Sequence, residues 1–466
     1  MGAGRTAHRG CVLAMHAAGL APARAAALRV LARVRRDQAY TGPVLDAELQ
    51  RAALAPEDAA LATRLCYGVV SAEGVLDEAI DRHLRASLEP LLRDVLRLAA
   101  YELLFSRAPA YAVVDQAVLA ARAIRPQAAG LVNAIARHLA EDAPAFPWGD
   151  PASDRAALAR ATAHPRWIVD LALKELGSER GREALESGLE PAPTYVRLNP
   201  FAQDVDVTLD SLRRSGAEPT ASPPDRDCVV LGSPTAAFRG ETGPAFFAMD
   251  AAAQIAPAAC RPRPGLDILD ACSGRGNKTI CLQAIAARHG GAADITAADV
   301  HSGKVEMLAK RLALGHVPAV TAITTDILDS PAPVMDASYD VVLLDAPCTG
   351  LGTLRRYPEK RWRLAPAAVD RMAGLQRRLL EAVSRVVRPG GCVVYSTCSV
   401  SSAENGGVVR GFLAAAAGSG FRVEPIAEIV PPEWAMFLDG EGCFQSWPTT
   451  GGPDGHYVAV IRRDRD

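Results

Sequence analysis

The first long stretch of the chain, from about residue 24 to residue 139, has apolar residues that recur every three or four positions. The run LLRDVLRLAAYELL (91–104) is one example, and AVVDQAVLAA (112–121) is another. This spacing places apolar side chains on one face of an α-helix. Glycine and proline residues interrupt the pattern at intervals, as between successive helices. The pattern therefore predicts an all-helical bundle domain.

A different pattern begins at about residue 265, where short apolar runs alternate with helical periodicity. The runs predict buried strands, at 266–269, 295–298, 320–323, 341–344 and 392–395. Helices are predicted between them, at 277–288, 304–314 and 369–387. Extended runs at 421–424 and 457–461 complete the set. Such alternation is typical of an α/β fold with a doubly wound, mostly parallel sheet, here of seven strands.

Changes in composition divide the chain further. Residues 1–22 are predicted to be a disordered extension or the result of a mis-called start, and 23–140 the helical domain. The segment 141–155 is rich in Pro, Asp and Gly, which is typical of a linker. Residues 156–260 mix helical and extended patterns and are predicted to precede the catalytic domain, 261–466.

Composition narrows the class of protein. The 466 residues are 49% hydrophobic and 22% charged, which is the balance of a globular protein. We see no apolar run of about 18 residues, so no membrane span is expected. The net charge of −2 means that nucleic acid would have to bind at local basic patches. The ten cysteines form no CxxC pair, so we expect no metal site and mostly reduced thiols in a cytoplasmic protein.

The ends of the predicted strands carry a candidate nucleoside site. The first strand runs into DACSGRGNKT (270–279), whose glycines would let the backbone approach a ligand. Asp299 ends the second strand and suits paired ribose hydroxyls, while Asp326 follows the third and could accept from an adenine amino group. Because no phosphate-binding GxxxxGK[ST] loop is present, S-adenosylmethionine is favoured over a nucleoside triphosphate, with NAD as the structural alternative.

Two cysteines lie just beyond the fourth and fifth predicted strands, in DAPC (345–348) and STCS (396–399). If these strands are neighbours, Cys348, Cys398 and Asp345 share one crevice. A thiolate that adds to carbon 6 of a cytosine makes carbon 5 nucleophilic toward a methyl donor. Asp345 could stabilise the adduct at ring N3 if its proton is retained. The chemistry alone leaves open which thiol attacks.

The stretches LLDAPCTGLGTLRRYPEKRWR (343–363) and YSTCSVSSAEN (395–405) resemble the two signature motifs of the RNA (cytosine-5) methyltransferase family. The resemblance implies a Rossmann-like class I methyltransferase domain that uses S-adenosylmethionine. It assigns attack to Cys398 and product release to Cys348. The implied cofactor-binding residues are Asp270, Cys272, Ser273, Gly274, Arg275, Gly276, Lys278, Asp299, Lys304, Asp326 and Asp345.

Upstream, HPRWIVD (164–170) and YVRLNPFAQD (195–204) resemble the family's substrate-side region. The helical part resembles a NusB-type RNA-binding fold through RLCYGVV (64–70), LRLAAYELL (96–104), AYAVVDQAV (110–118) and GLVNAIAR (130–137). Members with both parts modify 16S ribosomal RNA. Three features depart from the family: the loop CSGRGNKT stands for the usual CAAPGGKT, Met249 stands where a Gln is typical, and GHYVAVI (455–461) stands for a more aromatic GFFYA-like stretch.

A basic stretch after the first cysteine motif is the candidate RNA contact. Cationic side chains can bind phosphate groups, and aromatic rings can stack on unpaired bases. The residues expected to contact RNA are Arg355, Arg356, Lys360, Arg361 and Trp362. The leading hypothesis is a monomeric enzyme that methylates carbon 5 of a cytosine in small-subunit ribosomal RNA. Two alternatives remain: a methyltransferase for tRNA, and a non-catalytic RNA-binding assembly factor suggested by the altered glycine loop.

Overall fold

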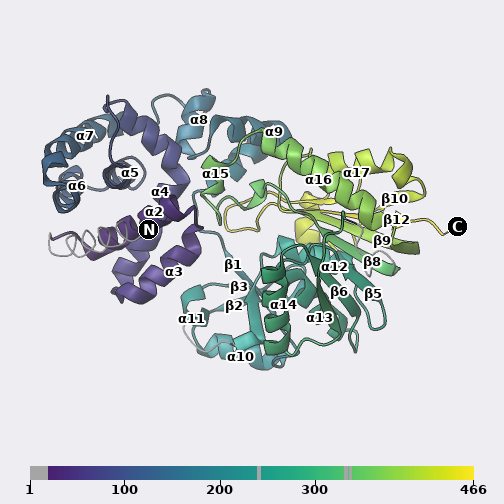
Figure 1. Ribbon diagram of the computed structural model, residues 1–466. Helices are drawn as coiled ribbons and strands as arrows, with labels where there is room; N and C mark the ends of the chain where they lie inside the picture. Colours follow the sequence, from purple (N-terminus) through teal and green to yellow (C-terminus); the bar gives the residue numbers. More distant parts are fainter. Residues whose placement is uncertain (1–18, 239–242, 330–333, 335–337, 466) are drawn as a thin grey trace. The chain divides into compact units, whose positions relative to one another are not determined.

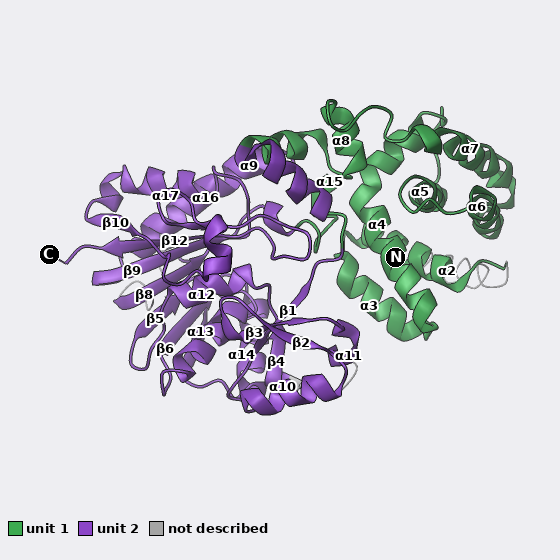
Figure 2. Cartoon of the chain, turned by 180° about the vertical axis from the view of Figure 1, so that it is seen from behind, with its two compact units in different colours: residues 1–174, 188–190, 354–364 green, residues 175–187, 191–353, 365–466 purple. Residues whose placement is uncertain are grey.

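The computed structural model describes residues 19–238, 243–329, 334 and 338–465 (Figure 1). The predicted extension, 1–22, lies almost entirely outside the described residues. The chain divides into two compact units, coloured in Figure 2. Unit 1 comprises residues 1–174, 188–190 and 354–364, and unit 2 comprises 175–187, 191–353 and 365–466.

Unit 1 is helical, as the periodicity predicts. Its main helices are α2 (Pro22–Asp37), α3 (Thr41–Ala52), α4 (Pro56–Asp81), α5 (Pro90–Leu104), α6 (Ala110–Ile124) and α7 (Ala129–Asp142). Three of these helices begin with proline, which suits the first turn because the missing N–H would have no partner there. Their apolar faces meet in one core that includes Leu28, Leu65 and Leu96.

The segment predicted as a linker packs on this helical core. It contains a short 3-10 helix, Ala143–Ala145, and is followed by α8 (Arg155–Ala161). The ring of Phe146 lies 5.1 Å from that of Phe105, and the guanidinium of Arg82 lies 4.2 Å above the Trp148 ring. Aromatic burial and cation–π contacts thus hold residues that composition alone indicates as a linker.

Among the described residues, one helix is long and apolar enough to cross a membrane by length and composition, namely α4. Half of the window that passes this test is buried within the protein, and a core helix passes it as readily. Residues of α4 such as Leu65, Val69 and Leu76 belong to the core of unit 1.

The first part of unit 2 is an antiparallel sheet in the region predicted to precede the catalytic domain. Its described strands are β1 (Thr194–Leu198), β2 (Pro219–Ser222), β3 (Asp225–Leu231) and β4 (Phe246–Ala248), in the order β2-β3-β1-β4. The helices α10 (Val205–Arg214) and α11 (Pro234–Phe238) accompany it, and α9 (Arg166–Ser187) precedes it.

The larger sheet of unit 2 matches the predicted doubly wound fold. Its described strands follow the order β10-β12-β9-β8-β5-β6-β7, and a short β11 pairs with β12. The strands are β5 (Asp267–Asp270), β6 (Asp294–Asp299), β7 (Val320–Thr324), β8 (Tyr339–Asp345), β9 (Val387–Thr397), β10 (Phe421–Glu424), β11 (Phe444–Gln445) and β12 (Tyr457–Arg463). Neighbouring strands from β9 to β7 run parallel, whereas β12 is antiparallel to both β9 and β10.

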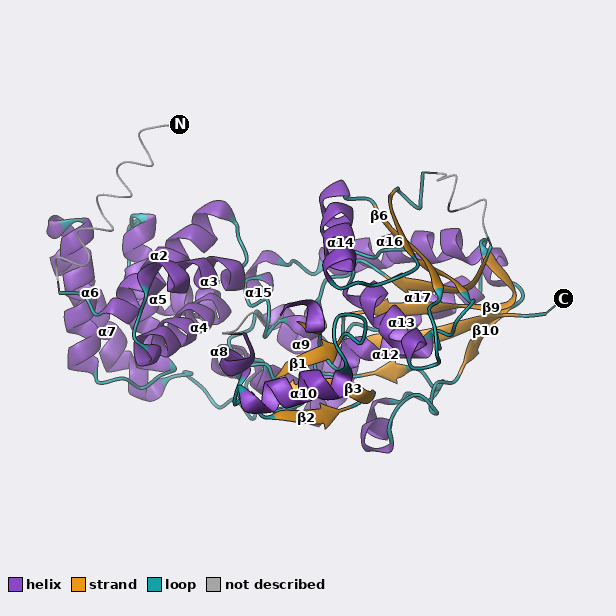
Figure 3. Ribbon diagram, turned by 90° about the horizontal axis from the view of Figure 1, so that it is seen from below, coloured by secondary structure: helices purple, strands orange, loops and turns teal. Residues whose placement is uncertain are grey.

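Helices cover both faces of this sheet (Figures 1 and 3). They are α12 (Ile255–Ala259), α13 (Asn277–Ala287), α14 (Ser302–Leu314), α16 (Ala367–Ser384) and α17 (Gly406–Leu413). Along β8, Val341 and Leu343 pack in the core that contains Leu282 of α13, while Val342 and Leu344 pack in the core that contains Leu380 of α16. Burial on both faces explains why these strands are continuous apolar runs in the sequence.

Candidate active site

The loop between β5 and α13 is built around two glycines with positive φ. Gly274 has φ 58° and Gly276 has φ 86°, a region that favours glycine. A Cβ atom on Gly276 would lie 2.2 Å from Cδ1 of Leu308 in α14. The loop is further held by the Ser273 amide, which donates to the carbonyl of Ala298 at 2.9 Å. The backbone therefore runs close to the carboxyl end of β6.

Three predicted acids lie at the carboxyl ends of neighbouring strands. The Asp299 side chain is buried, and its carboxylate accepts hydrogen bonds from the backbone amides of Gly274, at 3.0 Å, and His301, at 2.9 Å. Burial alone would raise its pKa, but these hydrogen bonds and the Lys304 ammonium lower it below its ordinary value. Asp326 accepts from the Leu328 amide at 2.9 Å, which fixes its side chain.

Asp270 is the most deeply placed acid of the site. It is fully buried, and its Oδ2 accepts from the Thr279 hydroxyl at 2.7 Å. Its Oδ1 has no hydrogen-bond partner within the described part of the chain. Loss of solvent raises the pKa of Asp270 to about 7. The buried Oγ of Ser273 likewise has no partner among the described residues, so this loop carries unused polar atoms.

The two predicted cysteines meet, because β8 and β9 are parallel neighbours with Asp345 in register with Ser396. The sulfurs of Cys348 and Cys398 lie 3.1 Å apart, and the Cys398 amide donates to the Cys348 sulfur at 3.3 Å. Both residues are half-buried free cysteines. The hydrogen bond to Cys398, together with burial, raises the pKa of Cys348 well above its ordinary value.

Asp345 at the end of β8 joins the first turn of α13 to the end of β9. Its Oδ2 is 2.7 Å from the ammonium of Lys278, and its Oδ1 accepts from the Ser396 hydroxyl at 2.8 Å. Burial opposes the charge of Lys278, but the Asp345 carboxylate raises the pKa of the lysine above its ordinary value. The first turn of α13 thereby supplies a cation that interacts electrostatically with the Cys398 sulfur, which also contributes to the raised pKa of Lys278.

Comparison with known proteins agrees with this geometry. Residues 257–462 match the family described as 16S rRNA methyltransferase RsmB/F, and residues 21–141 match the NusB family. The ribosomal RNA small subunit methyltransferase B of Thermus thermophilus is 33% identical over 94% of this chain and 97% of its own. The chain belongs to the RsmB/F family.

Two further comparisons cover nearly the whole length of this RsmB/F-family chain. A Mycobacterium tuberculosis protein described as a methyltransferase is 33% identical over 95% of this chain and 97% of its own. The crystal structure of PH0851 shares the fold, with a TM-score of 0.78 and 22% identity over 96% of this chain. The family resemblance, the fold class and the NusB-like domain predicted from the sequence are thus confirmed, as is the activity of an S-adenosylmethionine-dependent methyltransferase.

The residues of the RsmB/F-family site fit S-adenosylmethionine. The carboxylate of Asp299 at the end of β6 is a suitable acceptor for ribose hydroxyls, and its Lys304 and Gly274 contacts keep it ionised. The buried Oδ1 of Asp270 and Oγ of Ser273, which have no hydrogen-bond partner in the described part of the chain, would be available to polar groups of the ligand. Among the described residues, no group of three or more His, Cys, Asp or Glu is arranged to hold a metal ion.

The predicted RNA-contact segment, Leu354–Leu364, packs in unit 1. Arg361 is fully buried, and its guanidinium donates to the carbonyls of Ala163, at 3.0 Å, and Gly188, at 2.5 Å. Burial lowers the pKa of Arg361 to about 9. These contacts show Arg361 as part of the packing of unit 1, so its guanidinium is not presented at the surface of this unit.

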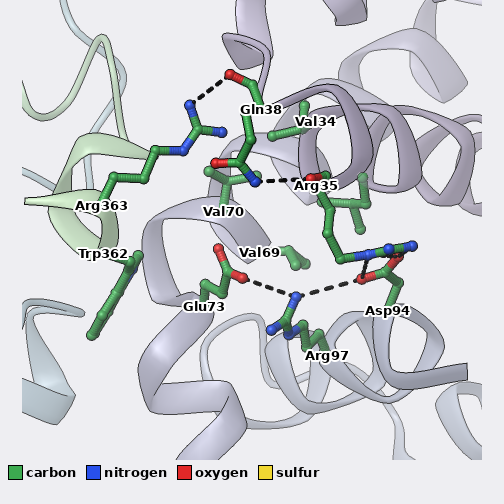
Figure 4. Close-up of a pocket in the computed structure, with 11 residues that line it drawn as sticks. Val34, Arg35, Gln38, Val69, Val70, Glu73, Asp94, Arg97, Trp362 and Arg363 are labelled. Atoms are coloured by element: carbon green, nitrogen blue, oxygen red, sulfur yellow. Dashed lines mark hydrogen bonds and ion pairs between the residues drawn. The ribbon is translucent and has the colours of Figure 1, made fainter. Parts of the chain in front are cut away.

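Trp362 and Arg363 form one wall of a pocket of about 150 Å³ in unit 1 (Figure 4). The Trp362 indole N–H donates to the carbonyl of Ser71 at 2.8 Å, and Arg363 donates to the carbonyl of Gln38 at 3.0 Å. Arg97, which also lines the pocket, lies between the carboxylates of Glu73 and Asp94. The indole and the cations of this pocket are therefore held by protein groups.

The other predicted RNA contacts differ in exposure. Arg355 is buried, whereas Arg356 and Lys360 are half-buried. The ammonium of Lys360 lies 5.3 Å from the centre of the exposed Tyr357 ring. A cation beside an exposed aromatic ring is suited to RNA. An RNA contact therefore remains a prediction chiefly for Arg356 and Lys360.

The loop between β5 and α13 makes one contact that the sequence did not predict. Arg311 at the end of α14 donates to the carbonyl of Arg275 and to the side-chain oxygen of Asn277, both at 2.6 Å. Asn277 in turn donates to the carbonyl of Ala248 at 3.2 Å. The departures Arg275 and Asn277 are thus joined to a neighbouring helix. In the sequence, Asn277 stands where the family usually has a second glycine, and this substitution was the available sign of a changed contact. The sequence could not identify the partner, because Arg311 is 34 residues away from Asn277.

Proposed function

We propose that this enzyme transfers a methyl group to carbon 5 of a cytosine in 16S ribosomal RNA through a covalent adduct with Cys398. The observation that carries the proposal is the 3.1 Å separation of the Cys348 and Cys398 sulfurs beside the Lys278–Asp345 ion pair. The RsmB/F family and the named relatives support the ribosomal substrate. The enzyme would act in the cytoplasm, where ribosomal RNA is modified, and as a monomer.

The proposed reaction begins when the Cys398 thiolate forms a bond to carbon 6 of the pyrimidine. The electron pair of the 5,6 double bond moves toward carbon 5, which becomes nucleophilic. Bound S-adenosylmethionine would supply the electrophilic methyl group: carbon 5 forms a bond to the methyl carbon while the bond from that carbon to the donor sulfur breaks, and S-adenosylhomocysteine leaves. The carbon-5 proton is then removed by a base, the 5,6 double bond re-forms and the bond between carbon 6 and the Cys398 sulfur breaks.

The electrostatics of the pair support different roles for the two thiols. The Lys278 ammonium interacts with the Cys398 sulfur, and a nearby cation favours a thiolate. Cys348 has its pKa raised by the Cys398 hydrogen bond, by burial and by the negative charge of Glu404. A protonated Cys348 next to the leaving thiolate suits the proposed part in product release.

Asp345 and Lys278 would orient the target base. Asp345 is 31% exposed, so it can reach a ligand while it accepts from Lys278 and Ser396. The proposed contact of Asp345 with ring N3 would orient the base. It would stabilise the adduct in the form in which the Asp345 carboxyl carries a proton, because that form donates a hydrogen bond where negative charge develops.

The test uses three single variants of the full-length protein with labelled S-adenosylmethionine and small-subunit RNA. Cys398→Ala is expected to abolish methyl transfer, because no adduct can form. Cys348→Ala is expected to accumulate a covalent protein–RNA complex, seen as a slow, RNase-sensitive band on a denaturing gel. Cys392→Ala, a change to a buried cysteine on β9, serves as the control and is expected to retain activity.

Each outcome of this test has a defined meaning. A trapped band with Cys398→Ala in place of Cys348→Ala would reverse the roles of the two thiols. Methyl transfer that survives Cys398→Ala would contradict the covalent route. Mapping of 5-methylcytosine on ribosomal RNA and tRNA offered together distinguishes the proposed substrate from tRNA.

A further inference from the structure

A buried carboxylate lies against both cysteine loops. Glu404 follows Cys398 in the chain and is 0% exposed. Its Oε1 accepts from the Thr349 amide at 2.8 Å, and its Oε2 accepts from the Thr349 hydroxyl at 2.5 Å and from the Ser399 hydroxyl at 2.7 Å. One side chain therefore holds the residue after Cys348 and the residue after Cys398 at the same time.

Gln376 provides a second connection between Glu404 and the loop that carries Cys348. The Gln376 amide nitrogen donates to Glu404 Oε1 at 3.2 Å and to the carbonyl of Pro347 at 2.9 Å. Gln376 belongs to α16 and is fully buried. The residues on both sides of Cys348 are thus fixed, one by Glu404 directly and the other through Gln376.

The backbone around Glu404 is also held in place. The Tyr395 hydroxyl donates to the carbonyl of Glu404 at 2.5 Å, and the side-chain amide nitrogen of Asn405 donates to the carbonyl of Ser399 at 2.9 Å. Because a buried carboxylate loses its hydration, it is retained at low cost only where hydrogen bonds replace that hydration. Four donated hydrogen bonds from three residues do so here.

We propose that Glu404 is a positioning residue that sets the distance between the two catalytic sulfurs by cross-linking their loops. The inference rests on the proposed function for its catalytic meaning, but the distance itself can be tested without methyl transfer. The negative charge of Glu404 also contributes to the raised pKa of Cys348, which agrees with a protonated thiol at that position. Reaction geometry is sensitive to such placement, since a displacement of about 1 Å can cost about a hundredfold in rate.

The first experiment measures the sulfur pair directly. The full-length protein is treated with diamide, which accepts the two hydrogens of a pair of thiols, and the Cys348–Cys398 disulfide is quantified by peptide mass spectrometry. We expect Glu404→Ala to slow this disulfide at least about tenfold, because the loops lose their common partner. Glu424→Gln, which affects an ion pair with Arg462 at another part of the sheet, is the matched control and should leave the rate unchanged.

The second experiment separates positioning from a general loss of structure. Glu404→Ala should lower kcat about tenfold to a hundredfold while KM for S-adenosylmethionine stays within about twofold, because the cofactor loop is not among its contacts. Glu404→Gln keeps the shape and should give a smaller loss. Where Glu404→Ala fails to fold, Thr349→Val and Ser399→Ala remove single hydroxyl partners and should slow disulfide formation in the same direction.

The outcomes distinguish this inference from the proposed function. An unchanged disulfide rate in Glu404→Ala, or in both hydroxyl variants, would overturn the positioning role even if methyl transfer proceeds as proposed. A slowed disulfide with no methyl transfer by the unaltered enzyme would leave the positioning role supported and would refute the proposed reaction. A parallel loss of kcat and of cofactor binding would show a general structural role and would also overturn the inference.

Discussion

The buried acid at the end of β5 offers a quantitative test of the structure. Asp270 has no exposed surface, and its pKa is about 7 because burial disfavours the charged form. In the unfolded chain the same carboxyl titrates at its ordinary value of 3.8. Replacing it by Asn keeps the size and the capacity to accept from Thr279 while it removes the titration.

The direction in which stability changes with pH follows from proton linkage. Between these two pKa values the folded protein holds a proton that the unfolded chain has lost, so the folded state becomes less stable as the pH rises. Each pKa unit corresponds to about 1.4 kcal/mol, so the acid costs the folded state about 2.5 kcal/mol more at about pH 8 than at about pH 5. Asp270→Asn lacks this cost, and its stability relative to the unaltered protein should rise by that amount over the same interval.

Pulse proteolysis in urea, with surviving peptides of unit 2 measured by mass spectrometry, gives the free energy of unfolding at each pH. Glu424→Gln is the control, because the lowered pKa of Glu424 places its titration below this interval and Glu424 is not among the charges that shift the pKa of Asp270. Its stability relative to the unaltered protein should therefore be flat from about pH 5 to about pH 8. A flat difference for Asp270→Asn as well would refute the assignment of a protonated, desolvated acid to the end of β5.

Two other changes test packing. Gly276→Ala should weaken S-adenosylmethionine binding at least about tenfold in calorimetry, since its Cβ would meet Leu308 at a φ that disfavours alanine. Gly274→Ala, with no described atom within 4 Å of its Cβ, should weaken binding less, and equal effects would contradict the steric argument. Trp362→Ala should lower the free energy of unfolding of unit 1 by about 3 kcal/mol in urea denaturation, because the ring packs on that unit and its N–H binds the Ser71 carbonyl. A change within about 0.5 kcal/mol would argue against that packing.

Much of the catalytic sheet was predictable because its strands are buried on both faces. Continuous apolar runs such as 341–344 and 392–395 leave few alternatives, and the structure places them in β8 and β9. The antiparallel direction of β12 was not predictable, since an apolar run has the same pattern in either direction. The packing of residues 141–155 on unit 1 was also hidden, because Phe146 and Trp148 make their contacts with distant helices.

The sequence by itself was enough to place the two cysteine motifs, the glycine loop and the acids at the ends of strands, because each of them lies at or just after the end of an apolar run that forms a strand of the sheet. Only the tertiary structure decided which charged residues remain accessible: Arg361 is a candidate RNA contact in the sequence, but its side chain is buried against backbone carbonyl groups. It also decided that Glu404 bonds to Thr349, which is 55 positions away. Burial and hydrogen bonding depend on neighbours in space, and for these residues the neighbours come from remote parts of the chain.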